Sequence, residues 1–341
     1  MSLFTKRIKI NTPKLLSALA FSLLTDICLA QTPPAAVLEE IDPGLRKIVT
    51  QAFKAEIIAE GFDWSEGPLW VESKQMLLFS DVPKNIIYKW TSEKGKEIYL
   101  SPSGYTGTRP RGGEPGSNGL LLNPKGQLVL CQHGDRKMAM MDASLDHPLP
   151  KFVTLADNYR GKKFDSPNDA AYHPNGTLYF TDPPYGLERN IRDSSKAAPY
   201  QGVYKLSKNG HVDLLADTIS RPNGIAIFPG GKRILIANSD RAKPFWYVYE
   251  LDSEGRLIKG KIFSTTLGTN KTDRGLPDGL KIDKQGNVFA SGPGGIWIFN
   301  KDGRILGKIR VPSLVSNCAL SADGKTLFLT ADMNVLRIRL R

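Results

Sequence analysis

The segment His173-Pro-Asn-Gly176-Thr-Leu-Tyr-Phe-Thr-Asp182 combines a polar turn ending in glycine, an alternating apolar run and a closing aspartate. Glycine suits such a turn because it adopts positive φ angles without steric cost, and the alternating run is typical of a β-strand. Related strings recur along the chain. They are Val71-Glu-Ser-Lys74-Gln-Met-Leu-Leu, Asn123-Pro-Lys-Gly126-Gln-Leu-Val-Leu, Phe228-Pro-Gly-Gly231-Lys-Arg-Ile-Leu, Asp283-Lys-Gln-Gly286-Asn-Val-Phe-Ala and Ser321-Ala-Asp-Gly324-Lys-Thr-Leu-Phe.

The spacing of these six copies indicates the architecture. Their turn residues are separated by 52, 50, 55, 55 and 38 residues. A period of this length, filled with short strands and turns, is typical of one four-stranded blade per repeat. We therefore predict an all-β fold, a six-bladed β-propeller. A ring of five or seven blades is the alternative, and six copies favour it less.

The two ends of the propeller are expected to meet. The C-terminal run from Asn334 to Leu340 contains Val, Leu, Ile and Leu and alternates apolar and polar residues from Leu336 on. This pattern predicts a strand that closes the ring beside an early strand such as Ala55-Glu-Ile-Ile-Ala59.

The first thirty residues differ from the rest of the chain. Four basic residues precede or begin the apolar run from Leu15 to Leu24, and Cys28-Leu-Ala30 supplies small residues where a signal peptidase cleaves. The run is short for a bilayer span, which favours a signal peptide over a membrane anchor. We predict a signal peptide over residues 1–30 and a single propeller domain over residues 31–341. The mature protein is expected in the periplasm or the medium, without a membrane segment.

The charge and the cysteines narrow the possible partners. The chain of 341 residues has a net charge of +12, but its basic residues are scattered, which indicates a solvated exterior and no nucleic-acid interface. Cys131 and Cys318 fall in copies separated by a blade, too far apart for a disulfide. We expect two free, buried thiols. The sequence leaves the oligomeric state undefined.

One polar position recurs at a fixed distance before each turn. Eight residues back from the turn residue, or seven in the last copy, stand Glu66, Asn118, Asn168, Asn223, Asp278 and Asn317. A single Asx-Gly pair is usually a turn that bonds its own backbone. Six acidic or amide residues in one register favour a shared role, because the innermost strand of each blade lines the channel. Their side chains are expected to converge on its axis.

Carboxylate and amide oxygens form a hard, oxygen-only ligand set. Such a set suits Ca²⁺, or another hard divalent cation such as Mg²⁺ or Mn²⁺. Zinc is disfavoured, because the chain has 4 His and no paired His or Cys-x-x-Cys spacing. The sequence also lacks the Gly-x-Ser-x-Gly elbow, the phosphate-binding loop and the His-Glu-x-x-His motif.

Five motifs occur in order along the mature chain. They are Ser65-Glu66-Gly-Pro, Ser166-Pro-Asn168-Asp169, Phe180-Thr-Asp182-Pro-Pro-Tyr185-Gly, Arg221-Pro-Asn223-Gly and Leu276-Pro-Asp278-Gly-Leu. Together they resemble the gluconolactonase, or SMP-30-like (LRE-like), family, and its bacterial gluconolactonase branch in particular. The resemblance implies a six-bladed propeller with a divalent cation at the channel mouth. It also implies that the metal ligands are Glu66, Asn168, Asn223 and Asp278.

Other positions complete the expected site. Animal members of the family carry a substrate-contacting Arg two residues before the first ligand Asn, where this chain has Ser166. We expect the loop before Asn118 to supply sugar contacts instead. The predicted substrate-binding residues are Asn118, Arg109, Arg111, Glu114 and His133. Asp278 is the candidate catalytic base, although a carboxylate held by a cation is less basic. Asp182 and Tyr185 are expected to shape the loop of the third blade.

The motifs and ligand set favour metal-dependent hydrolysis of a small-molecule sugar lactone, of the glucono-1,5-lactone type, to the sugar acid. Two alternatives stay open. A phosphotriester or aryl-ester hydrolase would use the same metal site but calls for an apolar pocket lining. A non-catalytic propeller that binds a ligand or a partner would not need the ligand set.

Overall fold

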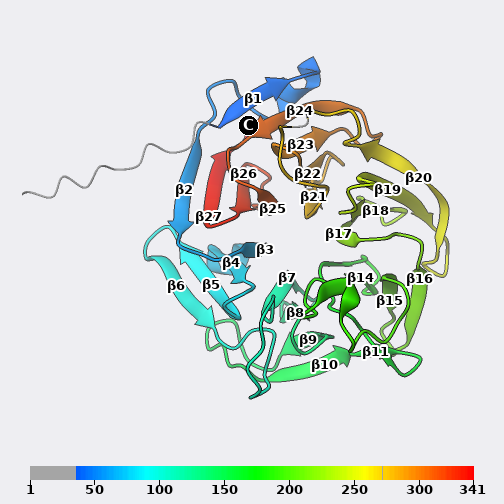
Figure 1. Cartoon of the computed structure of the whole chain (residues 1–341). Helices are drawn as coiled ribbons and strands as arrows, with labels where there is room; N and C mark the ends of the chain where they lie inside the picture. The colour runs from blue at the N-terminus through cyan, green and yellow to red at the C-terminus, as the bar shows by residue number, and fades with distance from the viewer. Residues whose placement is uncertain (1–35, 271) are drawn as a thin grey trace, which may run out of the picture. The chain divides into compact units, whose positions relative to one another are not determined.

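The computed structural model describes residues 36–270 and 272–341, so the predicted signal peptide lies outside the described residues. In the described part, antiparallel sheets stand radially around a central channel (Figure 1). The first strand of each sheet contacts the first strands of both neighbouring sheets, and the sixth contacts the first. The predicted six-bladed β-propeller is confirmed.

The blades follow one another along the chain, and the first strand of each is the innermost. Blade 1 contains β3 (Ser65–Val71), β4 (Met76–Asp81), β5 (Ile86–Thr91) and β6 (Gly95–Leu100). Blade 2 contains β7 (Ser117–Leu122), β8 (Leu128–Gln132), β9 (Lys137–Met141) and β10 (Phe152–Ala156). Blade 3 contains β13 (Ala170–Tyr172), β14 (Leu178–Asp182), β15 (Gly202–Leu206) and β16 (Val212–Ala216).

The second half of the ring repeats this order. Blade 4 contains β17 (Pro222–Ile227), β18 (Arg233–Asn238), β19 (Phe245–Leu251) and β20 (Leu257–Thr265). Blade 5 contains β21 (Leu280–Ile282), β22 (Val288–Gly292), β23 (Gly295–Phe299) and β24 (Ile305–Arg310). Blade 6 contains β25 (Val315–Leu320), β26 (Thr326–Ala331), β27 (Asn334–Arg339) and, outermost, β2 (Ala55–Glu60).

Short elements decorate the blades. A two-stranded hairpin of β11 (Asn158–Tyr159) and β12 (Lys162–Lys163) lies in the connection from blade 2 to blade 3. Three 3-10 turns are η1 (Pro43–Lys47), η2 (Glu72–Lys74) and η3 (Asn190–Arg192). No helix among the described residues has the length and apolar character to span a bilayer.

Blade 6 closes the ring with strands from both ends of the described chain. β27 pairs antiparallel with β2, in a register that sets Ala55 opposite Ile338 and Glu60 opposite Asn334. The predicted closure is therefore confirmed. The sequence did not indicate β1 (Val37–Glu40), which pairs with β24 and adds a fifth strand to blade 5.

The recurrent turn forms as its sequence predicts, with one shift. In blade 2 the Asn123 side chain accepts hydrogen bonds from the N–H groups of Lys125 and Gln127, each at 2.9 Å. Gly126 takes the left-handed conformation, with φ of 77°. In blade 1 this conformation falls on Gln75, with φ of 48°, one residue after the expected turn position.

Apolar clusters fill the spaces between neighbouring blades. Between blades 6 and 1, for example, Trp70 stacks on Phe328 with ring centroids 5.0 Å apart. Between blades 4 and 5, Trp246 meets Phe299 edge to face at 5.3 Å. Each of the six described interfaces contains such a cluster, so the blades stabilise one another side by side.

The two thiols of the described chain behave as predicted. Cys131 on β8 and Cys318 on β25 are both free and buried. Burial raises the pKa of Cys318 to about 12, so its unreactive thiol form predominates.

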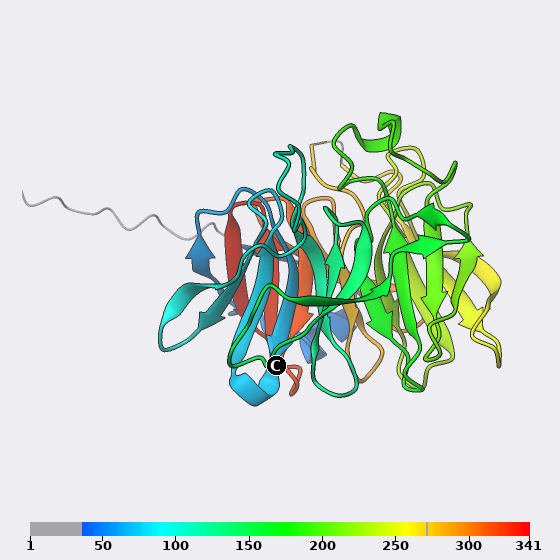
Figure 2. The same ribbon diagram turned by 90° about the horizontal axis from the view of Figure 1, so that it is seen from below.

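The longer loops project from one face of the ring (Figure 2). They connect β6 to β7 over residues 101–116, β14 to β15 over residues 183–201, and β20 to β21 over residues 266–279. Loops at one end of a propeller surround the channel mouth, so this face is where a ligand site is expected.

The first prediction concerns ring closure. Leu336 on β27 is 1% exposed and packs in the cluster between blades 5 and 6. Leu336→Ala should lower the free energy of unfolding by about 2–5 kcal/mol, because it leaves a cavity beside the closing strand pair. Arg339→Ala, at an exposed position of the same strand, is the control and should change it by less than about 0.5 kcal/mol. Equal urea midpoints for both variants would contradict this account of closure.

Candidate functional site

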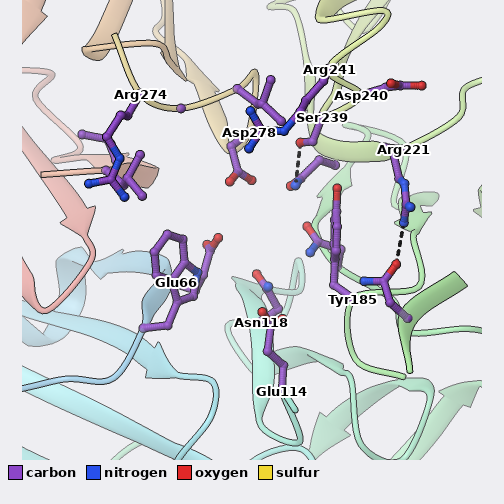
Figure 3. Close-up of a pocket in the computed structure, with 18 of the residues that line it drawn as sticks. Glu66, Glu114, Asn118, Tyr185, Arg221, Ser239, Asp240, Arg241, Arg274 and Asp278 are labelled. Atoms are coloured by element: carbon purple, nitrogen blue, oxygen red, sulfur yellow. Dashed lines mark hydrogen bonds between the residues drawn. The ribbon is translucent and has the colours of Figure 1, made fainter. Parts of the chain in front are cut away.

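A cavity of about 720 Å³ opens at the channel mouth. Its floor consists of residues from the innermost strands, and its rim consists of the loops of the face described above (Figure 3). The lining is predominantly polar, with Trp64, Leu276, Leu314 and Val315 as its larger apolar members.

Five of the six residues in the recurrent register line this cavity. They are Glu66, Asn118, Asn168, Asn223 and Asp278. Glu66, Asn118 and Asn223 are the second residues of β3, β7 and β17, and the other two stand two residues before β13 and β21. Four are buried, while Asp278 is partly exposed.

The sixth register residue departs from the prediction. Asn317 on β25 does not line the cavity, because its Oδ1 accepts the N–H of Cys318 at 2.8 Å and receives Lys281 Nζ at 3.3 Å. Its Nδ2 approaches Glu66 Oε2 at 3.5 Å. Asn317 therefore supports Glu66 from the neighbouring blade.

Glycines explain how the floor residues come together. A Cβ on Gly67 would lie 1.9 Å from the carbonyl oxygen of Asn118, and one on Gly224 would lie 2.3 Å from that of Asp278. No side chain fits at these distances, so glycine permits neighbouring inner strands to touch. The Asx-Gly pairs of the sequence are thus contacts between blades, rather than isolated turns.

Asn223 has a fixed orientation. Its Nδ2 donates to Ser239 Oγ at 3.0 Å, and that hydroxyl donates its only proton to the carbonyl of Pro277. Since Ser239 can only accept from Asn223, the amide nitrogen faces Ser239. The Asn223 oxygen is then the atom left for a ligand.

Two floor oxygens lack hydrogen-bond partners. Asn118 Oδ1 and Asp278 Oδ1 are buried, and neither has a partner among the described residues. Unpaired buried oxygens are rare in native proteins, and a bound cation is one ordinary explanation. They indicate a site prepared for an electropositive ligand.

The floor carboxylates repel one another in the absence of such a ligand. Burial raises the pKa of Glu66 above its usual range, and the charges of Asp169 and Glu114 add to this effect. Burial likewise raises the pKa of Asp278, followed by the charges of Glu66 and Glu114. A divalent cation would remove this repulsion.

The amide residues are essential to any cation site here. Over residues 36–270 and 272–341, no three His, Cys, Asp or Glu side chains cluster closely enough to hold a metal ion. A cation at this cavity would therefore combine the two carboxylates with asparagine oxygens. That oxygen-only set suits Ca²⁺ and other hard divalent cations.

Polar residues at the ends of the second strands of blades 3 and 4 fix the backbone that leads to the floor. Asp182 accepts the N–H groups of Asp165 at 2.9 Å and Ser166 at 2.7 Å, which fixes the backbone leading to Asn168. Asn238 accepts the N–H of Arg221 at 2.8 Å in the same way. Asp182 thus shapes its loop, as the sequence indicated.

The predicted substrate-binding residues divide into two groups. Glu114 lines the cavity together with Asn118. His133 does not: it is fully buried behind Glu114, with Nδ1 3.4 Å from Glu114 Oε2. Neither ring nitrogen of His133 has a hydrogen-bond partner among the described residues.

Arg109 and Arg111 lie elsewhere. They line a separate depression of about 260 Å³. Arg111 donates to the carbonyl of Gly134 at 3.0 Å and also to that of Gly186, so it ties neighbouring loops together. Neither Arg109 nor Arg111 lines the cavity at the channel mouth, where the sequence analysis expected both to contact the substrate.

Three arginines of the cavity were not predicted as site residues. Arg221, Arg241 and Arg274 lie on its rim, together with Tyr185, which the sequence analysis had placed in the loop of the third blade. Burial raises the pKa of Tyr185 above its usual range. Only Arg221 had a signal, because it directly precedes Pro222-Asn223 in one of the recurring motifs.

Comparisons with known proteins identify the family. The model of the SMP-30/Gluconolactonase/LRE-like region matches residues 64–332. A gluconolactonase of Zymomonas mobilis is 42% identical over 315 residues, covering 89% of this chain and 85% of that protein.

Solved structures agree with this assignment. A gluconolactonase from Xanthomonas campestris is 25% identical, with a TM-score of 0.76 over 92% of this chain and 99% of that chain. The calcium-binding protein regucalcin from Agrobacterium tumefaciens is 17% identical, with a TM-score of 0.65 over 84% of this chain and 95% of that chain, and shares the fold. The chain belongs to the SMP-30/gluconolactonase/LRE-like family.

Proposed function

We propose that this protein hydrolyses a sugar lactone, of the glucono-1,5-lactone type, with a divalent cation bound at the channel mouth. The observation that carries the proposal is the convergence of five oxygen-bearing side chains on one cavity. The 42% identity to a gluconolactonase supports lactone hydrolysis as the reaction class. The cation and the glucono-type substrate are the further steps of the proposal.

The residues proposed to hold the cation are Glu66, Asn168, Asn223 and Asp278. Their support is the oxygen-only donor set, the fixed amide of Asn223 and the mutual repulsion of the two neighbouring carboxylates. Ca²⁺ is the favoured ion, with Mg²⁺ and Mn²⁺ as alternatives. A bound divalent cation supplies Lewis acidity at a lactone carbonyl and offsets the carboxylate charge.

The chain's own residues account for proton transfer and orientation. Asp278 is partly exposed to the cavity and its Oδ1 is unpaired, so it is proposed to accept the proton of the attacking water. The water oxygen adds to the lactone carbonyl carbon, the ring C–O bond breaks, and the proton passes to the leaving ring oxygen. Asn118 and Glu114 are placed to orient sugar hydroxyls.

The cavity lining favours a sugar over an aromatic ester. Phe and Met are absent from the described lining, and Trp64 and Tyr185 are its aromatic members. Asparagine, glutamate and arginine side chains offer hydrogen bonds that a hydrophobic phosphotriester or aryl ester would leave unpaired. The same placement of ligands disfavours a purely structural or partner-binding propeller.

Export is part of the proposal. The basic start, short apolar run and Ala30 cleavage position support a signal peptide over residues 1–30. The mature protein is proposed to act in the periplasm or the medium.

The second prediction tests the cation. Treating the mature protein with a chelator should abolish lactone hydrolysis, because the carboxylates alone cannot polarise the carbonyl. Adding Ca²⁺, or another hard divalent cation, should restore it. The measurement is acid release from glucono-1,5-lactone, corrected for spontaneous opening. Full turnover by metal-free, folded protein would refute the proposed cation.

The third prediction tests Asp278. Asp278→Asn keeps an oxygen of similar shape but removes a charge and any basic function, so kcat should fall by about 10²-fold or more. Asn118→Ala should mainly raise KM, if Asn118 orients hydroxyls of the substrate. Asp283→Asn, at a turn of the same blade outside the cavity, is the matched control and should be near normal.

Circular dichroism should show that all three variants are folded. Near-normal kcat for folded Asp278→Asn would place the base elsewhere. The buried His133, beside Glu114, would then be the next residue to substitute.

The fourth prediction concerns processing. Protein purified from its native host should begin near Gln31 and be recovered from the periplasm or the medium. N-terminal sequencing or intact mass measures the start. Uncleaved protein in the cytosolic fraction would argue against export.

A further inference from the structure

Three arginines lie on the rim of the cavity and come from neighbouring blades. Arg221 directly precedes β17, Arg241 lies between β18 and β19, and Arg274 lies between β20 and β21. In Figure 3 they lie around the upper and right edges of the cavity, with Asp278 between Arg274 and Arg241, whereas Glu66, Asn118 and Glu114 lie below. The rim is therefore basic on the side of blades 4 and 5.

None of the three guanidinium groups is in direct contact with a carboxylate. The ion pairs that arginines form within the described part of the chain all involve other arginines. Arg221 donates to Asn190 Oδ1 at 2.8 Å and lies 5.8 Å from the ring centroid of Tyr185, so its position is fixed by neutral groups. Arg241 and Arg274 are exposed.

The acids nearest in sequence are engaged elsewhere. Asp273, which precedes Arg274, pairs with Arg310, whose Nη1 lies 3.0 Å from Asp273 Oδ2. Asp240, which precedes Arg241, accepts the hydroxyl of Ser220 and the N–H of Ala242. These bonds hold the pKa of both carboxyls below the usual range, and they leave Arg241 and Arg274 free for a ligand.

The rim therefore carries an excess of positive charge. The floor has two carboxylates that the proposed cation would neutralise, whereas the three rim arginines face the carboxylate of Asp240, because that of Asp273 is paired with Arg310. The amides and carboxylates of the floor already offer hydrogen-bond partners to neutral sugar hydroxyls, so a neutral sugar does not need the arginines. Guanidinium groups match carboxylate and phosphate oxygens in paired, charge-assisted hydrogen bonds.

We propose that the substrate lactone carries an anionic group, a carboxylate or a phosphate, which Arg241 and Arg274 bind while its carbonyl lies over the floor. The proposal rests on the lactonase function proposed above and specifies its substrate class. Arg221 lines the same side and extends the positive surface toward blade 3. The cavity volume of about 720 Å³ lies within the range of about 300–1,000 Å³ that holds drug-sized ligands, so a sugar lactone enlarged by an anionic group fits.

The test compares anionic and neutral lactones on the mature protein with its cation. The substrates are glucono-1,5-lactone, its 6-phosphate and glucaro-1,4-lactone, the last two separating phosphate from carboxylate. We expect kcat/KM for at least one anionic lactone to exceed that for the neutral one by about tenfold or more. The excess should shrink as ionic strength rises, because the rim arginines are exposed.

Variants locate the preference. The double variant Arg241→Gln with Arg274→Gln should reduce the anionic-to-neutral ratio by about tenfold or more. Arg339→Gln, an exposed arginine on β27 outside the cavity, should leave the ratio unchanged. A wild-type ratio near one, or a ratio that the double variant does not change, would overturn the anionic substrate. Cation-dependent hydrolysis of the neutral lactone would in that case still support the proposed function.

If no lactone is hydrolysed, a binding measurement tests the anion site separately from the lactonase function. The measurement is calorimetric titration of the protein with glucose 6-phosphate and with glucose. Binding of the phosphate ester alone, lost in the double variant, supports the site although the lactonase function has failed. Equal affinities for the two sugars, or no binding of either, overturn it.

Discussion

Close contact between neighbouring inner strands is the constraint on which the site depends. Because glycine follows the register residue in blades 1, 2, 4 and 5, the backbone of one blade touches that of the next at the channel axis. A side chain at Gly279 would lie 1.9 Å from Asn317, so the spacing tolerates nothing larger than hydrogen. The preceding residue of each pair is thereby brought to a common mouth. Ring closure by β2 and β27 makes the arrangement complete by setting blade 6 against blade 1.

The electrostatics of the site follow from this geometry. Strands that meet at an axis bring their polar residues together whether or not their charges are compatible. Here they bring together two carboxylates, those of Glu66 and Asp278, among amides. Burial raises the pKa values of Glu66 and Asp278, and the repulsion from neighbouring carboxylates adds to this effect. The proposed cation at the floor would relieve this repulsion, and the arginines at the rim lie on loops that the axial packing does not constrain.

The repeat in the sequence predicted the features that recur in every blade. Six copies of one turn and strand predicted the number of blades, and the fixed distance to each turn predicted five of the residues that line the cavity. The final pairing of Asn334 to Leu340 with the region of Ala55 to Ala59 followed from alternation alone. Asn317 shared the register but not the cavity, because its side chain bonds to its own strand and supports Glu66.

Residues outside the repeat were harder to place. The path of the loop over residues 101–116 depends on long-range contacts, such as those of Arg111 with two carbonyls, and no local pattern specifies them. The sequence therefore placed Arg109 and Arg111 with the ligand, and it gave no sign of Arg241 or Arg274. His133 directly follows β8, the second strand of blade 2, and is buried against Glu114 outside the cavity lining, a contact that depends on the fold of the preceding loop.

Cation binding by the channel floor is the central claim, and equilibrium dialysis of metal-free mature protein against Ca²⁺ tests it without reference to a substrate. The account predicts one tightly bound ion per chain in the wild type and a large loss of affinity in Glu66→Gln, since the amide removes one of two ligand charges. Glu254→Gln, at an exposed turn outside the cavity, should bind as the wild type does. Absence of binding for Ca²⁺, Mg²⁺ and Mn²⁺ alike, or equal affinity in Glu66→Gln, would contradict the account.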